Sequence, residues 1–232
     1  GLGTQIQARD LTADDYGGGA LEGAVDYLSI TRPDVLEEIH RSYLEAGSQA
    51  VETNSFQATA IRLEEWQRPD GGNLAEFVTD INVAAAAVAR KACDEFEAAD
   101  GIPRFVIGSI GPTGMLPGTD DPKLSGITFD ELANQIRTQA TGLMKGGADV
   151  LLIETQQDIL ETRAAIHGIR LAFDDMGTSV PIQAQVALDQ TGRMLLGTDV
   201  GAVVTILEAM GVDVIGTNCS VGPEHLREPV AY

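Results

Sequence analysis

One of the two cysteines of the chain, Cys219, directly follows an apolar run. A thiol at the end of a buried strand binds a metal, acts as a nucleophile or fills space in the core. A nucleophilic thiol needs a histidine or another cation beside it. The three histidines are poor partners, because His40 and His167 fall within predicted helices and His225 lies at a helix start. Packing is the commonest role of a free cysteine, so the residues alone leave the role of Cys219 open.

A carboxylate, Glu154, ends a second apolar run at residues 150–153. Where a strand enters a pocket, a carboxylate can bind an ammonium group or act as a base. The alternative is an ordinary ion pair at the surface. A glutamate also ends an earlier apolar run, in Glu52-Thr53-Asn54. Asn218, which precedes Cys219, likewise follows an apolar run. We therefore expect polar side chains at the carboxyl ends of several strands.

The surrounding chain alternates between short β-rich runs and longer stretches with helical spacing. Strands are predicted at 49–54, 104–109, 149–155, 181–187 and 213–218, and helices at 33–46, 74–98, 129–145, 159–175 and 200–210. Pro33 suits a first helical position, Thr128 and Glu131 form a capping box, and Asp199 is a predicted N-cap. These boundary residues support the helix assignments.

A helix–glycine–strand unit occurs three times, at Gly47, Gly147 and Gly211. This is the α-to-β half of a repeated βα unit, whose parallel strands carry chemistry at their carboxyl ends. An open doubly wound sheet would carry a glycine-rich phosphate loop between an early strand and a helix. The three glycines at 17–19 have no predicted strand before them and no predicted helix directly after them. Polar residues after several strands favour a ring of loops, so the predicted fold is α/β, a (β/α)8 TIM-type barrel.

The predicted barrel is incomplete. A complete barrel has eight strands and typically ~250 residues, whereas these 232 residues contain five predicted strands. We expect residues 1–232 to form one barrel domain, truncated at both ends, which lacks the start of strand one and roughly the last two βα units. Residues 1–7 are expected to be a βα loop.

Charge and cysteine content exclude several classes of function. The net charge is −20 at pH 7, which repels phosphate backbones and anionic lipid, so we expect neither nucleic acid nor membrane as a partner. No apolar run approaches the ~18 residues of a membrane span. The other cysteine, Cys93, falls in the middle of a predicted helix. Two cysteines make no disulfide framework and suit a cytoplasmic protein.

Blocks of sequence in a fixed order carry a family resemblance. They are residues 26–35, 39–47, 51–56, 107–113, 151–155 and 216–219. Together these blocks resemble the homocysteine S-methyltransferase family, and they are most similar to the homocysteine-binding N-terminal modules of cobalamin-dependent methionine synthases. Residues 1–7 resemble the first loop of the family.

The resemblance implies zinc-dependent methyl transfer to the thiol of homocysteine, which gives methionine. In the family, three cysteine thiolates hold Zn²⁺ and the sulfur of the substrate is the fourth ligand. Cys219 matches the first of these ligands. The other two form an adjacent cysteine pair in the family, and no such pair occurs in residues 1–232. We therefore expect these residues alone to bind zinc weakly or not at all and to be inactive.

The resemblance also implies a substrate pocket. Glu154 matches the residue that holds the ammonium group of the amino acid. Gly3 and Thr4 match the loop whose backbone N–H groups receive the carboxylate. Asn54 and Asn218 match strand-end positions that shape the pocket. No residue is matched to a catalytic acid or base.

The methyl donor follows from the resemblance alone. We expect methylcobalamin, carried by another module, with methyltetrahydrofolate-binding and cobalamin-binding modules in the same or a partner chain. The alternatives are a homocysteine methyltransferase that uses betaine or S-methylmethionine, and a non-catalytic amino-acid-binding barrel that has lost its metal. A different barrel enzyme, such as a lyase with Glu154 as its base, would carry a phosphate-binding glycine loop after the late strands.

Overall fold

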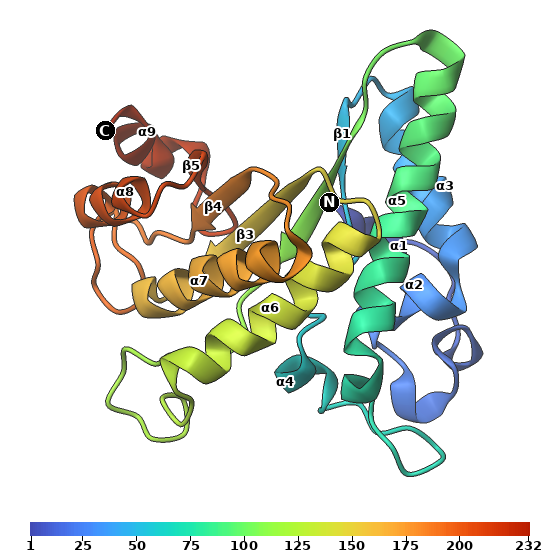
Figure 1. Cartoon of the computed structure of the whole chain (residues 1–232), viewed down its shortest axis with the longest axis horizontal. Helices are drawn as coiled ribbons and strands as arrows, with labels where there is room; N and C mark the ends of the chain where they lie inside the picture. The colour runs from blue at the N-terminus through green and yellow to red at the C-terminus, as the bar shows by residue number, and fades with distance from the viewer. The chain divides into compact units, whose positions relative to one another are not determined.

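The computed structural model describes residues Gly1–Tyr232 and divides into two compact units. The first unit comprises Gly1–Ser109 and Thr138–Val150. The second comprises Ile110–Arg137 and Leu151–Tyr232. Figure 1 gives the order of the elements along the chain.

The five predicted strands are all present, with ends that differ from the prediction by one or two residues. They are β1 (Ala50–Glu52), β2 (Phe105–Ile110), β3 (Val150–Gln156), β4 (Ile182–Val186) and β5 (Val214–Thr217). The helices are α1 (Leu2–Gln7), α2 (Leu28–Thr31), α3 (Pro33–Glu45), α4 (Ala60–Leu63), α5 (Val78–Asp100), α6 (Phe129–Lys145), α7 (Ile159–Met176), α8 (Val200–Ala209) and α9 (Pro223–Ala231). Short 3-10 turns are η1 (Ala13–Tyr16), η2 (Gly19–Leu21), η3 (Val25–Tyr27) and η4 (Leu74–Phe77). None of the helices combines the length and the apolar character that crossing a membrane requires.

The prediction for the N-terminal residues was wrong, because residues 2–7 form helix α1 and not a loop. The N–H of Gln5 donates to the carbonyl of Gly1 over 3.2 Å, and that of Ala8 to the carbonyl of Thr4 over 3.1 Å. Ile6 anchors the helix. It is only 2% exposed and packs in a cluster with residues of α2 and α3, including Leu36. The partly buried Leu2 packs against the same cluster. Two apolar residues, Leu2 and Ile6, are too short a pattern to predict a helix, so only the tertiary packing reveals it.

In the first unit, β1 and β2 pair in parallel, with Val51 opposite Val106. Helices α3 and α5 pack on each other, and both contact β1. They run side by side in Figure 1. Four fully buried alanines, at positions 85, 86, 89 and 92, line α5, and such small side chains let neighbouring elements approach closely. Gly47, with φ +99°, ends α3 and turns the chain into β1, as the pattern predicted.

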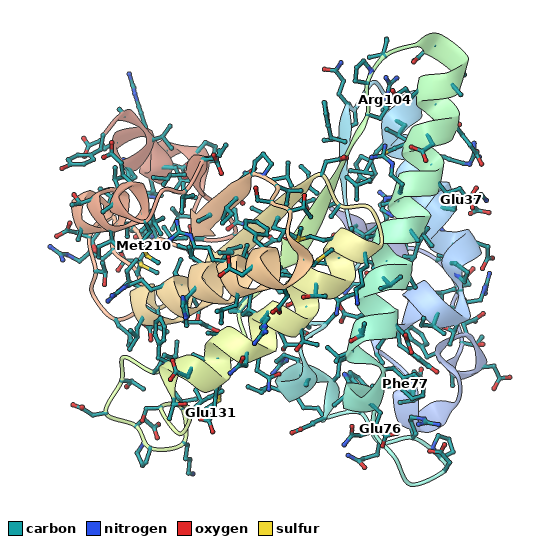
Figure 2. All side chains as sticks on the ribbon, viewed as in Figure 1. Glu37, Glu76, Phe77, Arg104, Glu131 and Met210 are labelled. Atoms are coloured by element: carbon teal, nitrogen blue, oxygen red, sulfur yellow. The ribbon has the colours of Figure 1, made fainter.

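Ion pairs hold the end of α5 and join α3 to α5 in the first unit. Arg104 lies beside the C-terminal end of α5 (Figure 2), where its guanidinium contacts Asp100 over 2.6 Å and the carbonyl of Ile102 over 2.6 Å. Glu37 on α3 (Figure 2) accepts a 2.5 Å hydrogen bond from Lys91 on α5. The pair of Glu37 and Lys91 is exposed, and such pairs contribute about 0–1 kcal/mol each, so the apolar face between α3 and α5 dominates their association.

In the second unit, β3, β4 and β5 form a parallel sheet. The apolar run of β3, at residues 151–153, is buried, and Ala184 and Val186 of β4 are at most 1% exposed. Helices α8 and α9 both contact β5, beside which Figure 1 shows them. Parallel strands buried in this way and joined through helices are typical of α/β barrels.

The predicted helix caps of the second unit are confirmed. The carboxylate of Asp199 accepts from the N–H of Ala202 over 3.0 Å at the start of α8. Before α6, Thr128 and Glu131 exchange side-chain to backbone hydrogen bonds of 2.8 and 3.2 Å. Figure 2 shows Glu131 at this end of α6. These bonds satisfy backbone donors that a helix start leaves without intrahelical acceptors.

Candidate functional site

Glu154 lies in a bulge of β3. The pairing of β3 with β4 passes from Ile153–Ala184 to Gln156–Val186, so β3 holds one more residue than β4 between these pairs. Bulges redirect side chains and are frequent beside active sites. Here the bulge leaves Glu154 only 8% exposed at the carboxyl end of the strand. Glu154 is therefore buried and does not lie at the surface, where the alternative role placed it.

Thr155, the second residue of the bulge, adopts a left-handed backbone with φ +58°. A β-branched residue rarely takes this conformation, which costs about 1–3 kcal/mol and persists only where the surroundings impose it. Its hydroxyl lies 3.4 Å from Oε2 of Glu154. Thr155 was not identified from the sequence, and no local pattern marks it.

Asn218, directly after β5, ties Glu154 and Thr155 together. Its Nδ2 donates to Oε2 of Glu154 over 2.9 Å and to Oγ1 of Thr155 over 3.1 Å. Its Oδ1 accepts from the backbone N–H of Thr155 over 2.9 Å. The backbone N–H of Asn218 in turn donates to the carbonyl of Val186 on β4 over 3.3 Å. The structure therefore brings Glu154 and Asn218, two of the candidate residues, into direct contact.

Cys219 follows Asn218 and also has a left-handed backbone, with φ +52°. Its side chain is exposed, so within residues 1–232 it does not fill space in the core. It lines a hollow of about 330 Å³ together with other residues of the second unit, among them Asp189 and Arg193. The thiol is thus accessible at the end of the strand that also positions Asn218.

The described residues do not supply a complete metal site. Nowhere in residues 1–232 do three or more His, Cys, Asp or Glu side chains gather in a way that could hold a metal ion. The second cysteine, Cys93, is fully buried in α5, and burial raises the pKa of its thiol to about 11, which keeps it protonated. Cys219 is therefore one thiol donor, and one donor does not fit a zinc site of three thiolates.

Asn54, at the carboxyl end of β1 in the first unit, is 5% exposed. Its Nδ2 donates to the carbonyl of Val25 over 2.7 Å and lies 3.4 Å from the hydroxyl of Ser29. That hydroxyl also contacts the carbonyl of Asn54 over 3.3 Å. The amide therefore fastens residues 25–29 to the end of β1, and it shapes this strand end from within.

A serine–threonine network joins the ends of β1 and β2 in the first unit. The hydroxyls of Thr53 and Ser55 lie 2.6 Å apart. Thr53 Oγ1 accepts from the N–H of Ser109 over 3.0 Å, and Ser55 donates to the carbonyl of Ser109 over 2.7 Å. Thr53 was not a candidate site residue and was named only within the run Glu52-Thr53-Asn54. The network shows that the polar strand end is a fixed structure.

Gly3 and Thr4 lie in the first turn of α1, in place of the expected loop. Amides in the first turn of a helix have no intrahelical acceptor, so their N–H groups keep their donor capacity. A Cβ built on Gly3 would meet nothing within 4 Å, and the side chain of Thr4 is exposed. The backbone N–H groups of these two residues are therefore accessible to a ligand.

Two buried carboxylates that the sequence did not reveal as a pair hold the segment after β2. Asp158, 2% exposed, accepts from the N–H of Leu160 over 2.8 Å and of Gly118 over 2.7 Å. Glu161, 3% exposed, accepts from the N–H and the hydroxyl of Thr113 over 2.7 and 2.6 Å. Burial raises the pKa of Glu161 to about 7 against the two hydrogen bonds from Thr113, with the charge of Asp158 adding to the rise.

Parallel strands, intervening helices and polar strand ends define an α/β protein of the barrel class with a small polar site. A family model described as homocysteine S-methyltransferase matches residues 1–232. The chain therefore belongs to the homocysteine S-methyltransferase family.

The chain is similar to much longer proteins. It is 43% identical over 230 residues to methionine synthase of Mycobacterium tuberculosis (strain ATCC 25618 / H37Rv) and 40% identical over 230 residues to that of Mycobacterium leprae (strain TN). Each match covers 97% of this chain and 18% of the relative. The chain thus spans less than a fifth of the length of these relatives.

Solved structures confirm the fold. The metallated form of the homocysteine methyltransferase MmuM from Escherichia coli matches with a TM-score of 0.71 and 22% identity, over 97% of this chain and 74% of that one. Its apo form matches with a TM-score of 0.69 and 20% identity, over 97% and 72%. At these identities the likeness speaks for the fold alone, and it agrees with the predicted part of a TIM-type barrel.

Proposed function

We propose that residues 1–232 form the homocysteine-binding part of an enzyme that transfers a methyl group to the thiol of homocysteine and gives methionine. The observation that carries this proposal is the buried Glu154 carboxylate, which Asn218 holds through a hydrogen bond. Cys219 follows Asn218 in the sequence, and its thiol is exposed. A carboxylate that can bind an ammonium group and a thiol that can ligate a metal, near the ends of β3 and β5, suit a ligand with an ammonium group and a sulfur.

Glu154 is proposed to bind the ammonium group of the substrate. A carboxylate that is largely withdrawn from water attracts a cation more strongly than an exposed one. The backbone N–H groups of Gly3 and Thr4 are proposed to receive the substrate carboxylate, since first-turn amides favour anions. Asn54 and Asn218 are proposed to shape the pocket at the ends of β1 and β5.

Cys219 is proposed to contribute one thiolate to a zinc ion in the full-length protein, with the remaining ligands supplied from outside residues 1–232. The resemblance to the family and the exposure of the thiol support this role. Because the donor set within these residues is incomplete, we expect them alone to bind zinc weakly or not at all and to be inactive.

The methyl donor is proposed to be methylcobalamin, presented by a separate cobalamin-binding module beside a methyltetrahydrofolate-binding module. Support comes from the 43% identity to a methionine synthase of which the chain covers 18%. Such a protein would be cytoplasmic, in keeping with its two free cysteines. One alternative is a non-catalytic amino-acid-binding barrel that has lost its metal. Betaine and S-methylmethionine are the alternative donors.

The test uses the full-length protein. Zinc content is measured by atomic absorption, and methyl transfer to homocysteine is assayed with methylcobalamin, betaine and S-methylmethionine. We expect Cys219→Ala to lose both zinc and transfer, and Cys93→Ala, a matched control at a buried helical position, to retain them. Zinc retained by Cys219→Ala would contradict the ligand role. Methyl transfer from betaine or S-methylmethionine, but not from methylcobalamin, would contradict the proposed methyl donor.

A further inference from the structure

Asn218 and Glu154 come from different strands that are not neighbours. Glu154 belongs to β3 and Asn218 follows β5, while β4 pairs with both strands and lies between them. The amide nevertheless reaches Oε2 of Glu154 over 2.9 Å. This contact passes over the end of β4, where the N–H of Asn218 is anchored to the carbonyl of Val186.

The side-chain amide of Asn218 is occupied by protein partners. An asparagine amide offers two N–H donors and one acceptor oxygen. Both donors are directed at Glu154 and Thr155, over 2.9 and 3.1 Å. The oxygen accepts from the N–H of Thr155 over 2.9 Å. Because neither N–H of the Asn218 amide is left for a ligand, Asn218 is suited to act on a ligand through Glu154. The hydrogen-bond partners also determine which end of the amide is the nitrogen.

Two strained residues flank this contact. Thr155 follows Glu154 with φ +58°, and Cys219 follows Asn218 with φ +52°. Left-handed conformations of such residues persist where surrounding interactions hold them. The side-chain amide of Asn218 supplies these interactions at Thr155, because it forms hydrogen bonds with both the backbone N–H and the hydroxyl of Thr155. The bulge that aims Glu154 is therefore fastened by Asn218.

We propose that Asn218 is a positioning residue that fixes the Glu154 carboxylate for the ammonium group of an α-amino-acid ligand. The inference rests on the proposed function, since it takes Glu154 as the ammonium-binding group. Its consequence is specific: Asn218 contributes to the recognition of the amino group and not to the affinity for the rest of the ligand.

Two ligands that differ in the amino group alone test the proposal. Calorimetry on the full-length protein gives the Kd of homocysteine and of 4-mercaptobutanoate, which has the same thiol and carboxylate but no amino group. We expect the preference for homocysteine to fall about tenfold in Asn218→Ala, while the Kd of 4-mercaptobutanoate stays within about twofold of the wild-type value. Asn218→Leu keeps about the same side-chain size, adds no charge beside Glu154 and loses both N–H donors, so it should behave in the same way.

Thr217→Val is the matched control. Thr217 precedes Asn218, and its hydroxyl donates to the carbonyl of Val186 over 2.8 Å without a bond to Glu154. This variant should keep the wild-type preference. An equal loss of affinity for both ligands in the Asn218 variants would mean a merely structural role and overturn the inference. So would an unchanged preference in a well-folded Asn218→Leu protein. A wild-type protein without any preference would overturn the ammonium role of Glu154, and the inference with it.

Discussion

The side-chain amide of Asn218 donates to Oε2 of Glu154 over 2.9 Å, although β4 separates the strands to which the two residues belong. In a flat sheet, alternate strands lie about 10 Å apart. Inside (β/α) barrels, inward side chains of alternate strands meet in layers. The contact is therefore of the kind that a barrel interior makes. It connects the carboxylate proposed to bind an ammonium group with the strand end that carries Cys219.

The charge of Glu154 is expected to determine the affinity for homocysteine. Glu154→Gln keeps the shape and removes the charge, so the KM for homocysteine should rise about tenfold or more, because a hydrogen bond to a charged group contributes about 1.5–3 kcal/mol. The effect on kcat should be smaller. Steady-state kinetics of the full-length protein measure both. Glu208→Gln, at an exposed position of α8, is the control, and equal KM values for the two variants would contradict the assignment.

The left-handed backbone at Thr155 predicts an unusual order of stabilities. Both Thr155→Ala and Thr155→Gly remove the hydroxyl, but only glycine adopts φ +58° without strain. We expect the glycine variant to have the higher free energy of unfolding, by about 1 kcal/mol. Chemical denaturation gives the difference. The same pair at Thr205, an exposed position in α8, should show the opposite order, and the same order at both sites would exclude backbone strain at Thr155.

The buried Glu161 predicts a loss of stability with rising pH. Its pKa is raised from 4.5 to about 7, so between these values the folded protein binds more protons than the unfolded chain. The free energy of unfolding should therefore decrease as the pH rises from 4.5 to 7. Glu161→Gln should flatten this part of the profile and be the more stable protein at pH 8, by on the order of 2 kcal/mol.

Denaturation at several pH values checks this prediction. Glu131→Gln is a suitable control, because the pKa of Glu131 is lowered by the hydrogen bonds from Thr128, and its effect has the opposite sign. A Glu161→Gln profile with the wild-type slope between pH 4.5 and 7 would show that this carboxyl ionises normally in the folded protein.

The close approach of α7 to α6 depends on Gly168. A Cβ at this position would overlap the backbone oxygen of Ala133 on α6, and backbone atoms cannot move aside as a side-chain end does. Gly168→Ala should lower the free energy of unfolding by about 1–3 kcal/mol. The control is Gly3→Ala in α1, where nothing lies within 4 Å of the added Cβ. Thermal unfolding that ranks Gly168→Ala as the more stable variant would contradict the packing seen between these helices.

Much of the fold could be predicted from the sequence, because its signals are local. Apolar runs mark the strands, and Gly47, Gly147 and Gly211 end helices with φ of +99°, +101° and +63°. Asp199 could be assigned as an N-cap from its position alone. Helix α1 could not be predicted, since its stability comes from the burial of Ile6 against distant residues.

The sequence alone determined the class of fold, the family resemblance and the set of polar strand-end residues, because periodicity, capping and residue type are properties of short segments. Tertiary structure decided what those residues do. The bond between Asn218 and Glu154 joins positions 64 residues apart, and the exposure of Cys219 depends on what packs around it. Both follow from which strands lie near each other and how the chain turns at their ends, and these are properties that no short segment contains.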